Sequence, residues 1–548
     1  LLTRTEKYYT GCERGWGQEK IQAQLAALRA DYDLLLKGQI ATHQAIYDRV
    51  RIDLHGSAVD RARSNEELLA LQKNAGVAVP ALWERIFDAG RYYYLSASSE
   101  LTPPDLLGIW TGDCNAGWGG YYHLDANVNL QVSGGNIGDM PEAMEGYFRL
   151  NEGWASDFRT NARKLLGCRG LLAAGNTPGT SSGLMASINT YYPYQYATGE
   201  EGWLLYPFWE HWLVTGDRQF LKDRIYPLLK EMGYFYEDFL KRMDSSGKYI
   251  FAASVSPENQ PSNVKISLLN NSTFDISGGR WALTALVETC RILGLEQGKG
   301  AGAERWSAIL AKLPPYLINS DGALAEWSWP GLLDHYNHRH SSQLLPVWPY
   351  REISQENTPE LFRAAAVTLA KKDQYNYENA GHGLLHGALI AAGLKNGQSL
   401  NAKLLRLTKE DYYYSSLSSS HYDKHGVFCT DVCNTVPAVM MEMLIASTPG
   451  VLELLPALPA GLDQGAIAGV KGRNLVTVES LSWNMERRTV NCVLRSSIDQ
   501  RITLIERTGI RTIAGSAEVS ASPLGRVARV LRLKAGVRTA VEMVVGAE

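Results

Sequence analysis

A run of alternating polar side chains in the segment YYHLDANVNLQ has the residue types of a binding or catalytic site: His123, Asp125, Asn127, Asn129 and Gln131. The residues between them are apolar, and this period of two predicts a strand or extended segment with its polar groups on one face. Hydrogen-bonding side chains are costly to bury unpaired, but they suit the wall of a cavity that holds a polyhydroxylated ligand. A polar-faced edge strand or an asparagine-rich turn would have the same composition.

Two carboxylates elsewhere stand in segments that suggest site loops. Glu258 lies in the polar turn SVSPENQP, and Asp431 lies just before a strongly apolar predicted helix. No other charged residue occurs between Val427 and Met441. Each carboxylate also has a simpler interpretation, because Glu258 would be ordinary in a solvated loop and Asp431 would be ordinary as a helix N-cap.

A third segment, DHYNHRHSSQLLPVWP, places three histidines around an arginine: His335, His338, Arg339 and His340. No carboxylate or cysteine completes the spacing of a metal site, so we expect neither a metal nor another cofactor. Contacts to sugar hydroxyls, or a buried polar network, suit these side chains better.

The composition excludes several classes of partner. The 548 residues carry a formal net charge of -3, which gives no indication of a nucleic-acid partner, and no apolar run approaches the ~18 residues of a membrane span. The 14 Trp and 28 Tyr far exceed the 11 Phe, and rings with a polar group are suited to stacking on sugars. The seven cysteines are scattered and odd in number, which indicates reduced structural residues rather than a disulfide framework.

The elements that must position these residues are mainly helical. Residues 18–50 have helical spacing, RVRIDL alternates like a short strand, and further helices are predicted at 65–74, 80–96, 140–166 and 204–214. Asp217 suits an N-cap and Pro227 the first turn of the next helix. After about residue 450 short alternating runs predict an all-β tail, most simply a small sandwich. Paired helices with long loops and no fixed-period repeat favour an (α/α) toroid over a solenoid.

Four motifs in the same order resemble glycoside hydrolase family 95. TPPDLLGIW followed by YYHLDANVNLQ resembles the first site loop of that family, and SVSPEN resembles its PSxSPEN loop. HRHSSQLLPVWP resembles HRHxSHLFGLYP, and FCTDVCNTVPAVMMEMLIAS with VLELLPALP resembles FQIDGNFGxxAGIAEMLLQS with ELLPALP. The resemblance implies an (α/α)6 barrel over residues 64–449 and a C-terminal β domain over 450–548. Residues 1–63 would then be a helical linker and the end of an N-terminal β domain, most of which we expect to precede LLTRTEKYY.

The resemblance implies an exo-acting, inverting hydrolase of α-L-fucosides or related L-sugars, with an oligosaccharide or glycan substrate and an extracellular or periplasmic location. Glu258 matches the general acid, Asp431 the carboxylate that helps to activate water, and Asn127 the asparagine that binds this water. Inversion needs two carboxyl groups roughly 6.5–9.5 Å apart on opposite faces of the sugar. The residues expected to contact substrate are Trp118, His123, His338, Arg339 and His340.

The sequence departs from the family pattern at three places, and the first two lie close to the substrate-recognition region. Asp125 stands where the family usually has a second asparagine, which adds a carboxylate, and we expect its pKa to be raised by repulsion from Asp431. The segment SINTYYPYQYATGEEGW replaces a histidine-containing HHNTDxW region, and VCNT replaces GNFG after the base. Two alternatives stay open. One is a sugar phosphorylase of the same architecture, and the other is a carbohydrate-binding protein that has lost turnover.

Overall fold

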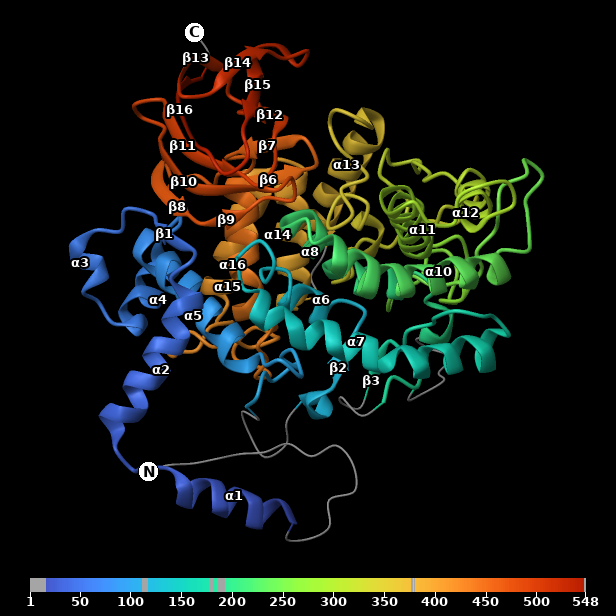
Figure 1. The fold of residues 1–548 in the computed structure, drawn as a ribbon, viewed down its shortest axis with the longest axis horizontal. Helices are drawn as coiled ribbons and strands as arrows, with labels where there is room; N and C mark the ends of the chain where they lie inside the picture. The colour runs from blue at the N-terminus through green and yellow to red at the C-terminus, as the bar shows by residue number, and fades with distance from the viewer. Residues whose placement is uncertain are drawn as a thin grey trace.

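The structure is a computed structural model that describes residues 16–110, 117–177, 182–185, 193–375, 378 and 380–546. Helices dominate the chain up to Leu444, and strands dominate it from Ile445 onward (Figure 1). The predicted switch from helices to strands near residue 450 is therefore confirmed. The strand end expected at LLTRTEKYY lies outside the described residues. In the part of the chain that the structure describes, no helix has both the length and the apolar character needed to cross a bilayer.

The helices agree with the sequence periodicity at most positions. Asp217 accepts from the backbone N–H groups of Gln219 and Phe220 as the predicted N-cap, and Pro227 lies in the first turn of the next helix. The helix expected over 18–50 is two helices, because the chain breaks after residue 27 and Asp31 caps the second one. In chain order the helices are α1 Trp16–Ala27, α2 Tyr32–Tyr47, α3 Ala58–Arg61, α4 Asn65–Asn74, α5 Pro80–Ala97, α6 Asn127–Gln131, α7 Pro141–Asn161, α8 Glu200–Thr215, α9 Arg218–Phe220, α10 Tyr226–Phe239, α11 Thr273–Leu293, α12 Gly302–Leu310, α13 Pro359–Tyr375, α14 Gly381–Gly393, α15 Gly397–Lys409 and α16 Asp431–Leu444.

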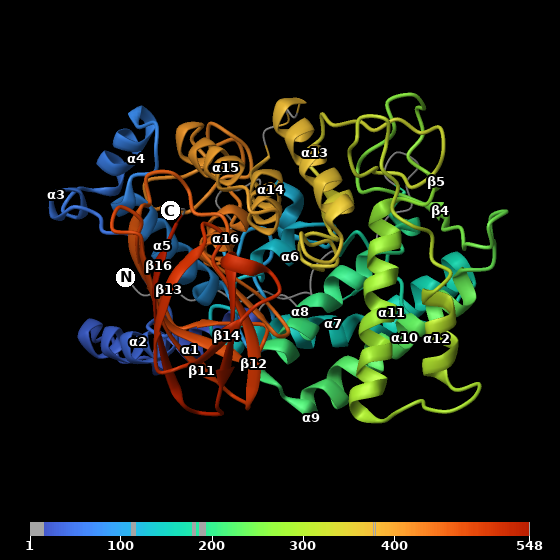
Figure 2. The ribbon, with the colours of Figure 1, turned by 90° about the horizontal axis from the view of Figure 1, so that it is seen from above.

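The short helix α6 lies at the centre of the helical part. It contacts α8, α14 and α16, and α16 in turn packs against α5 (Figure 2). The approach of α5 to α16 requires a glycine, because a Cβ on Gly90 would meet the Cys433 carbonyl oxygen at 2.2 Å. Three helices that are far apart in the sequence, α8, α14 and α16, thus pack against the segment that carries Asn127.

The expected extended conformation of the polar segment is wrong beyond its first residues. Only Tyr122–His123 is a strand, β2, and the residues from Asn127 onward form α6. Each amide in this segment has its own backbone acceptor. The Asn129 amide donates to the Leu124 carbonyl, and the Gln131 amide donates to the Asp105 carbonyl. These local bonds satisfy side chains that a one-faced strand would have left pointing into a cavity.

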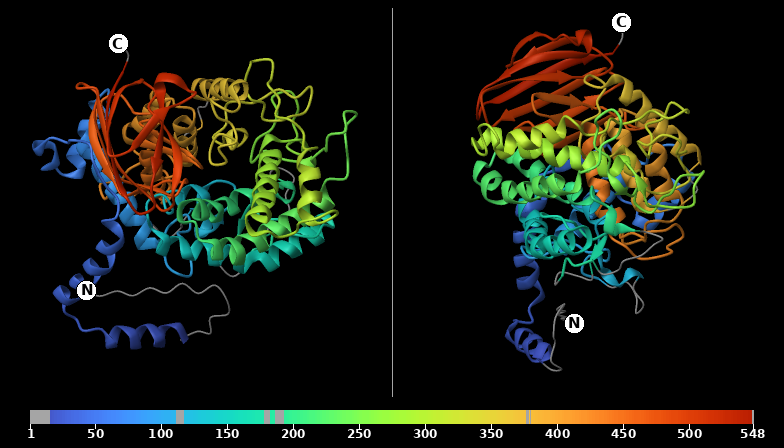
Figure 3. Two further views of the ribbon diagram at one scale, coloured as in Figure 1. Left: turned by 45° about the horizontal axis from the view of Figure 1, so that its top comes forward. Right: turned by 90° about the vertical axis from the view of Figure 1, so that its right-hand side faces the viewer.

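The C-terminal strands form two sheets, and β1 from the N-terminal part joins the first of them. One has the order β1-β8-β10-β11-β16-β13, with β9 paired to β10, and the other has the order β14-β15-β12-β7-β6. Buried Leu481 of the first sheet and Leu504 of the second belong to one hydrophobic cluster, which also includes buried residues of the helices. Figure 3 shows these strands gathered on one side of the helices. The strands are β1 Arg51–Asp53, β2 Tyr122–His123, β3 Asn176–Thr177, β4 Ala252–Ser254, β5 Leu269–Asn270, β6 Ile445–Thr448, β7 Val451–Leu454, β8 Gln464–Ala468, β9 Val470–Lys471, β10 Val476–Asn484, β11 Thr489–Ser496, β12 Gln500–Ile505, β13 Ile510–Gly515, β14 Glu518–Ala521, β15 Ala528–Leu533 and β16 Arg538–Val545.

A buried ion cluster links the sheets to the helices. Arg473, in the loop before β10, donates to Glu210 of α8 at 2.8 Å and to Glu442 of α16 at 2.6 Å. All three side chains are almost completely buried. Glu442 also pairs with Arg351, whereas Glu210 depends on Arg473 for its neutralisation.

Candidate active site

One pocket in the helical part contains most of the residues that the sequence singles out. All the predicted site residues line it except Asp431 and His338, and Asp431 bonds directly to two lining residues. The lining residues come from five separate parts of the chain. They are Leu106, Trp118, His123, Asp125, Asn127, Glu258, Arg339, His340, His382, His421 and Tyr422.

Glu258 is held in the pocket by the turn that follows β4. Ser256 and Asn259, on either side of it, donate to the two carboxylate oxygens of buried Glu326, at 2.7 and 2.8 Å. Glu258 itself has a φ of 56°, which is uncommon for a residue with a side chain and is typical of functional sites. The turn is thus fixed from behind, and it presents the Glu258 carboxylate to the cavity.

The partners of Glu258 show that it is not a solvated loop residue. Its Oε2 atom pairs with the guanidinium of Arg339 and lies 3.2 Å from His340 Nε2, while its Oε1 atom accepts from the Tyr194 hydroxyl at 2.8 Å. Burial alone would raise the pKa of this carboxyl, but the bond to His340 and the charge of Arg339 lower it well below its usual range. Glu258 is therefore ionised when the pocket is empty.

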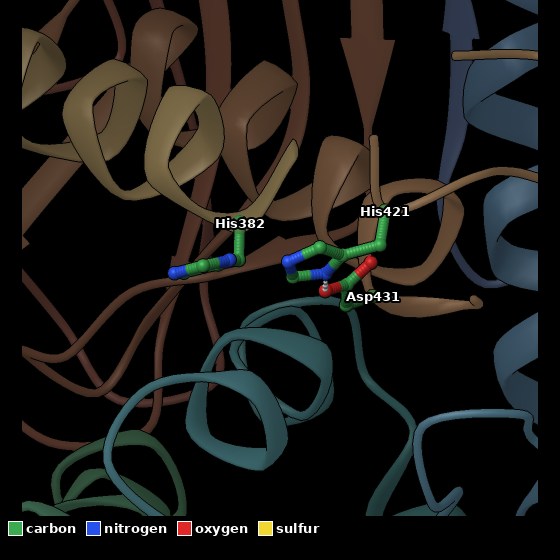
Figure 4. A group of neighbouring side chains, drawn as sticks. All are labelled: His382, His421 and Asp431. Carbon is green, nitrogen blue, oxygen red and sulfur yellow. Dashed lines mark hydrogen bonds and ion pairs between the residues drawn. The ribbon is translucent and has the colours of Figure 1, made fainter. Parts of the chain in front are cut away.

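Asp431 is the first residue of α16, and it is completely buried. Its Oδ2 atom accepts from Asn127 Nδ2 at 2.9 Å and lies 3.0 Å from His421 Nδ1, and the latter contact is drawn in Figure 4. Its side chain makes no capping bond, so the N-cap interpretation is wrong, and Thr430 occupies the cap position. Burial raises the pKa of Asp431, but His421 and Asn127 outweigh this effect and lower it. The carboxylate is therefore ionised and able to accept a proton.

Asp125 lies beside Glu258 rather than beside Asp431. Its Oδ2 atom accepts from the Tyr194 hydroxyl at 2.9 Å and is 4.0 Å from His340 Nε2. Burial and the charge of Glu258 raise the pKa of Asp125 to about 7. The expected rise in pKa is present, but its electrostatic source is Glu258 rather than Asp431.

The remaining predicted residues divide between the pocket and its support. Trp118 is partly exposed and stands edge-on to His421, with ring centroids 4.9 Å apart, so it suits a sugar platform. His123 lines the pocket, and burial lowers its pKa to about 4. His338 is not a lining residue; its Nε2 atom is 3.3 Å from the Pro257 carbonyl, and this contact steadies the Glu258 turn.

The sequence reasoning did not single out Tyr194, which bonds to two carboxyl groups of the pocket. It also did not single out four of the lining residues: Leu106, His382, His421 and Tyr422. Tyr194 lies within the segment that departs from the family pattern, and its abundance of tyrosine was the available signal. His421 precedes Asp431 by ten residues, and His382 lies at the start of the apolar helix α14. Nothing in their sequence surroundings distinguishes these two histidines from ordinary buried ones.

Two triads in the pocket have the donor types of a metal site. Within each, the ligand atoms lie within 4.8 Å of one another: His382, His421 and Asp431 (Figure 4), and Asp125, Glu258 and His340. In the second triad Arg339 already neutralises Glu258 and would repel a cation. In the first, Asn127 and His421 already bond to Asp431 Oδ2.

Comparison with known proteins points to one family. Residues 31–444 match the model of the "Glycosyl hydrolase family 95 catalytic domain". The chain is 30% identical over 476 residues to "Alpha-L-fucosidase 2" of Arabidopsis thaliana, covering 82% of the chain and 54% of that protein. It is 24% identical over 501 residues to "Probable alpha-fucosidase A" of Aspergillus niger, covering 85% of the chain and 60% of that protein. The chain thus spans little more than half the length of these relatives.

A solved structure shows a related fold. It is named "Putative kojibiose phosphorylase from human microbiome", and it superposes with a TM-score of 0.59 at 12% identity over 90% of this chain and 70% of that chain. At this identity the similarity describes the arrangement of helices and strands alone.

Proposed function

Because the chain belongs to glycosyl hydrolase family 95, we propose that it is an exo-acting, inverting glycoside hydrolase that removes a terminal α-linked sugar. The most suitable substrate is an α-L-fucoside or the glycoside of a related L-sugar, since two relatives are named as fucosidases. The observation that carries the proposal is the bond between Asn127 and buried Asp431, next to a pocket that also contains Glu258.

The proposed chemistry assigns one task to each of these three side chains. Glu258 protonates the glycosidic oxygen of the leaving group. Asp431 takes a proton from water, and the Asn127 amide orients that water toward the anomeric carbon. Attack opposite the departing oxygen would release the sugar with inverted configuration.

Substrate binding is assigned to the other polar and aromatic lining residues. Trp118 offers an aromatic face at the pocket entrance, while His123, Arg339 and His340 offer hydrogen-bonding groups to sugar hydroxyls. His338 would act at one remove, through the turn that holds Glu258. Asp125 adds a carboxyl group where the family has an amide, so the precise L-sugar depends on it.

The finer architecture is part of the same proposal. We assign residues 64–449 to an (α/α)6 toroid and residues 450–548 to a C-terminal β domain, with 1–63 as linker. The contact between α5 and α16 supports ring closure, because it joins helices from opposite ends of the proposed toroid. In such a toroid the loops at one end of the helix pairs form the pocket.

A screen of aryl glycosides tests the function. The purified chain is incubated with p-nitrophenyl α-L-fucoside, α-L-galactoside and α-L-rhamnoside, and NMR identifies the anomer that forms first. Release of the β-anomer supports inversion, and release of the α-anomer contradicts it. Formation of sugar 1-phosphate only in the presence of phosphate would identify a phosphorylase, and binding without turnover would identify a carbohydrate-binding protein.

A further inference from the structure

Tyr194 joins two carboxyl groups of the pocket into one hydrogen-bonded chain. Its hydroxyl oxygen lies 2.9 Å from Asp125 Oδ2 and 2.8 Å from Glu258 Oε1. Both distances are those of good O–H···O bonds, and the chain Asp125–Tyr194–Glu258 is removed from bulk water because Asp125 is buried and Tyr194 is half-buried.

The number of protons in this chain is fixed by simple chemistry. A phenol has one hydrogen and can donate it to only one acceptor at a time, and an ionised carboxylate can only accept. Two ionised carboxylates could not both bond to Tyr194. For both contacts to be hydrogen bonds, one carboxyl must itself carry a proton and donate it to the phenol oxygen.

The surroundings of the two carboxyls decide which one carries the proton. Glu258 has the guanidinium of Arg339 and the ring of His340 on its other oxygen. The charged and titratable groups that face Asp125 are Glu258, Tyr194, Arg339 at longer range, His340 at 4.0 Å, and buried Glu200. Burial and the charge of Glu258 thus oppose ionisation of Asp125, so its pKa is raised while that of Glu258 is lowered.

We propose that Tyr194 relays a proton from Asp125 to Glu258, so that the acid which protonates the leaving group is recharged within the pocket. The relay rests on the hydrolysis proposed above. As the Asp125 O–H bond breaks, a new O–H bond forms on the phenol oxygen, and the original phenol hydrogen passes to Glu258 Oε1. Asp125 ends as a carboxylate, Glu258 as a carboxylic acid and Tyr194 unchanged.

The relay answers a difficulty that the ion pair creates. A general acid must hold a proton at the working pH, yet Arg339 keeps Glu258 ionised when the pocket is empty. The proton arrives on Oε1, the oxygen that Arg339 does not contact. After bond cleavage that proton resides on the leaving group, and Asp431 has gained one from water. Exchange of Asp431 and Asp125 with solvent restores the starting state.

The test uses the full chain and its Tyr194→Phe, Asp125→Asn and doubly substituted variants. With a fucosyl disaccharide, whose leaving group needs protonation, each single variant should lose about 10²-fold in kcat/KM at pH 7. The alkaline limb of the kcat/KM profile should move to lower pH, because Glu258 then relies on its own lowered pKa. With p-nitrophenyl α-L-fucoside as substrate, the loss of kcat/KM should be much smaller. Tyr196→Phe, two residues away in the same turn, is the matched control and should leave the limb in place.

Non-additivity distinguishes a relay from separate structural effects. Breaking one chain twice costs no more than breaking it once, so the double variant should be as active as either single variant. Infrared difference spectra provide a readout without turnover: the C=O band of a protonated carboxyl that titrates near pH 7 should vanish in Asp125→Asn. An unmoved alkaline limb in both single variants, or an infrared band that persists in Asp125→Asn, would overturn the relay.

The isosteric Asp125→Asn exchange keeps the test informative if Tyr194→Phe does not fold. Failure of the proposed function has a different signature from failure of the relay. If Glu258→Gln is fully active, the assignment of the acid fails. If Glu258→Gln is inactive while the relay variants retain the native pH profile, only the relay fails.

Discussion

Replacing Glu258 by glutamine should separate its chemical role from its structural one. Glutamine has nearly the same shape, and Arg339 keeps a second carboxylate partner, Glu378, at 3.1 Å. Loss of the Glu258 charge therefore leaves the guanidinium paired, and we expect the fold and the pocket to survive. Circular dichroism and thermal melting of the variant check this directly.

The expected loss of activity depends on the leaving group. General acid catalysis contributes about 10²- to 10⁴-fold, or about 2.7–5.4 kcal/mol at 1.36 kcal/mol for each factor of ten. A fucosyl disaccharide needs the full contribution, because its alcohol leaves poorly without a proton. p-Nitrophenolate leaves unprotonated, so the aryl fucoside should lose about tenfold or less.

Steady-state kinetics on the two substrates decide between the roles. The ratio of their kcat/KM values should change by a factor of about 10 or more in favour of the aryl fucoside. Equal losses on both substrates would refute the reasoning, because they would show that the carboxylate binds or positions the sugar rather than protonating the leaving oxygen.

Three further predictions concern the base, the buried acid and the core. Asp431→Asn should lose about 10²- to 10⁴-fold in kcat/KM on both substrates alike. Asn127→Ala should lose about 10- to 100-fold, as expected for one hydrogen bond to a charged group. Unequal losses of Asp431→Asn on the two substrates would count against Asp431 as the base. The pKa of Asp125 is raised from 3.8 to about 7 in the folded protein, so the folded state holds a proton that the unfolded chain has lost between these values. The contribution of Asp125 to the free energy of unfolding is therefore largest below pH 4 and falls as the pH rises to 7. Melts at several pH values should show the free energy of unfolding of Asp125→Asn rising relative to wild type by up to about 4 kcal/mol between these pH values. A difference that does not change with pH would contradict this. Arg473→Met should lower the free energy of unfolding in urea by about 3–5 kcal/mol, because it leaves buried Glu210 without a cation and Glu442 with Arg351 alone. Arg495→Met, in an exposed ion pair, should lower it by less than about 1 kcal/mol.

The helices and the sheet region could be predicted from the sequence because their signals are local. The helix at Asn65–Asn74 begins and ends where its pattern indicated, with Ser64 and Glu67 forming a capping box. The Asp217 cap also depends only on neighbouring residues, because it accepts from the N–H groups of Gln219 and Phe220. Side-chain periodicity, caps and first-turn prolines act over a few positions, so a single sequence contains them in full.

The site could be predicted only as far as its separate segments and their family resemblance. The sequence suggested that Asp125, Asn127, Glu258 and Asp431 belonged to site loops, but their pairing was decided by tertiary structure. Asn127 bonds to a residue 304 positions away, and Asp125 meets Glu258 through Tyr194 rather than meeting Asp431. The period of two wrongly predicted a strand, because each polar side chain in this buried helix finds its own hydrogen-bond partner. Those partners include residues that lie far away in the sequence.

The sequence by itself determined the residue types of the site, the order of its segments and the change from helices to strands. The tertiary structure decided which carboxyl group stands beside which cation, and therefore which group is ionised. The ionisation of Asp125 and Glu258 depends on burial and on charges within a few ångströms, and those distances exist only once remote segments have packed together.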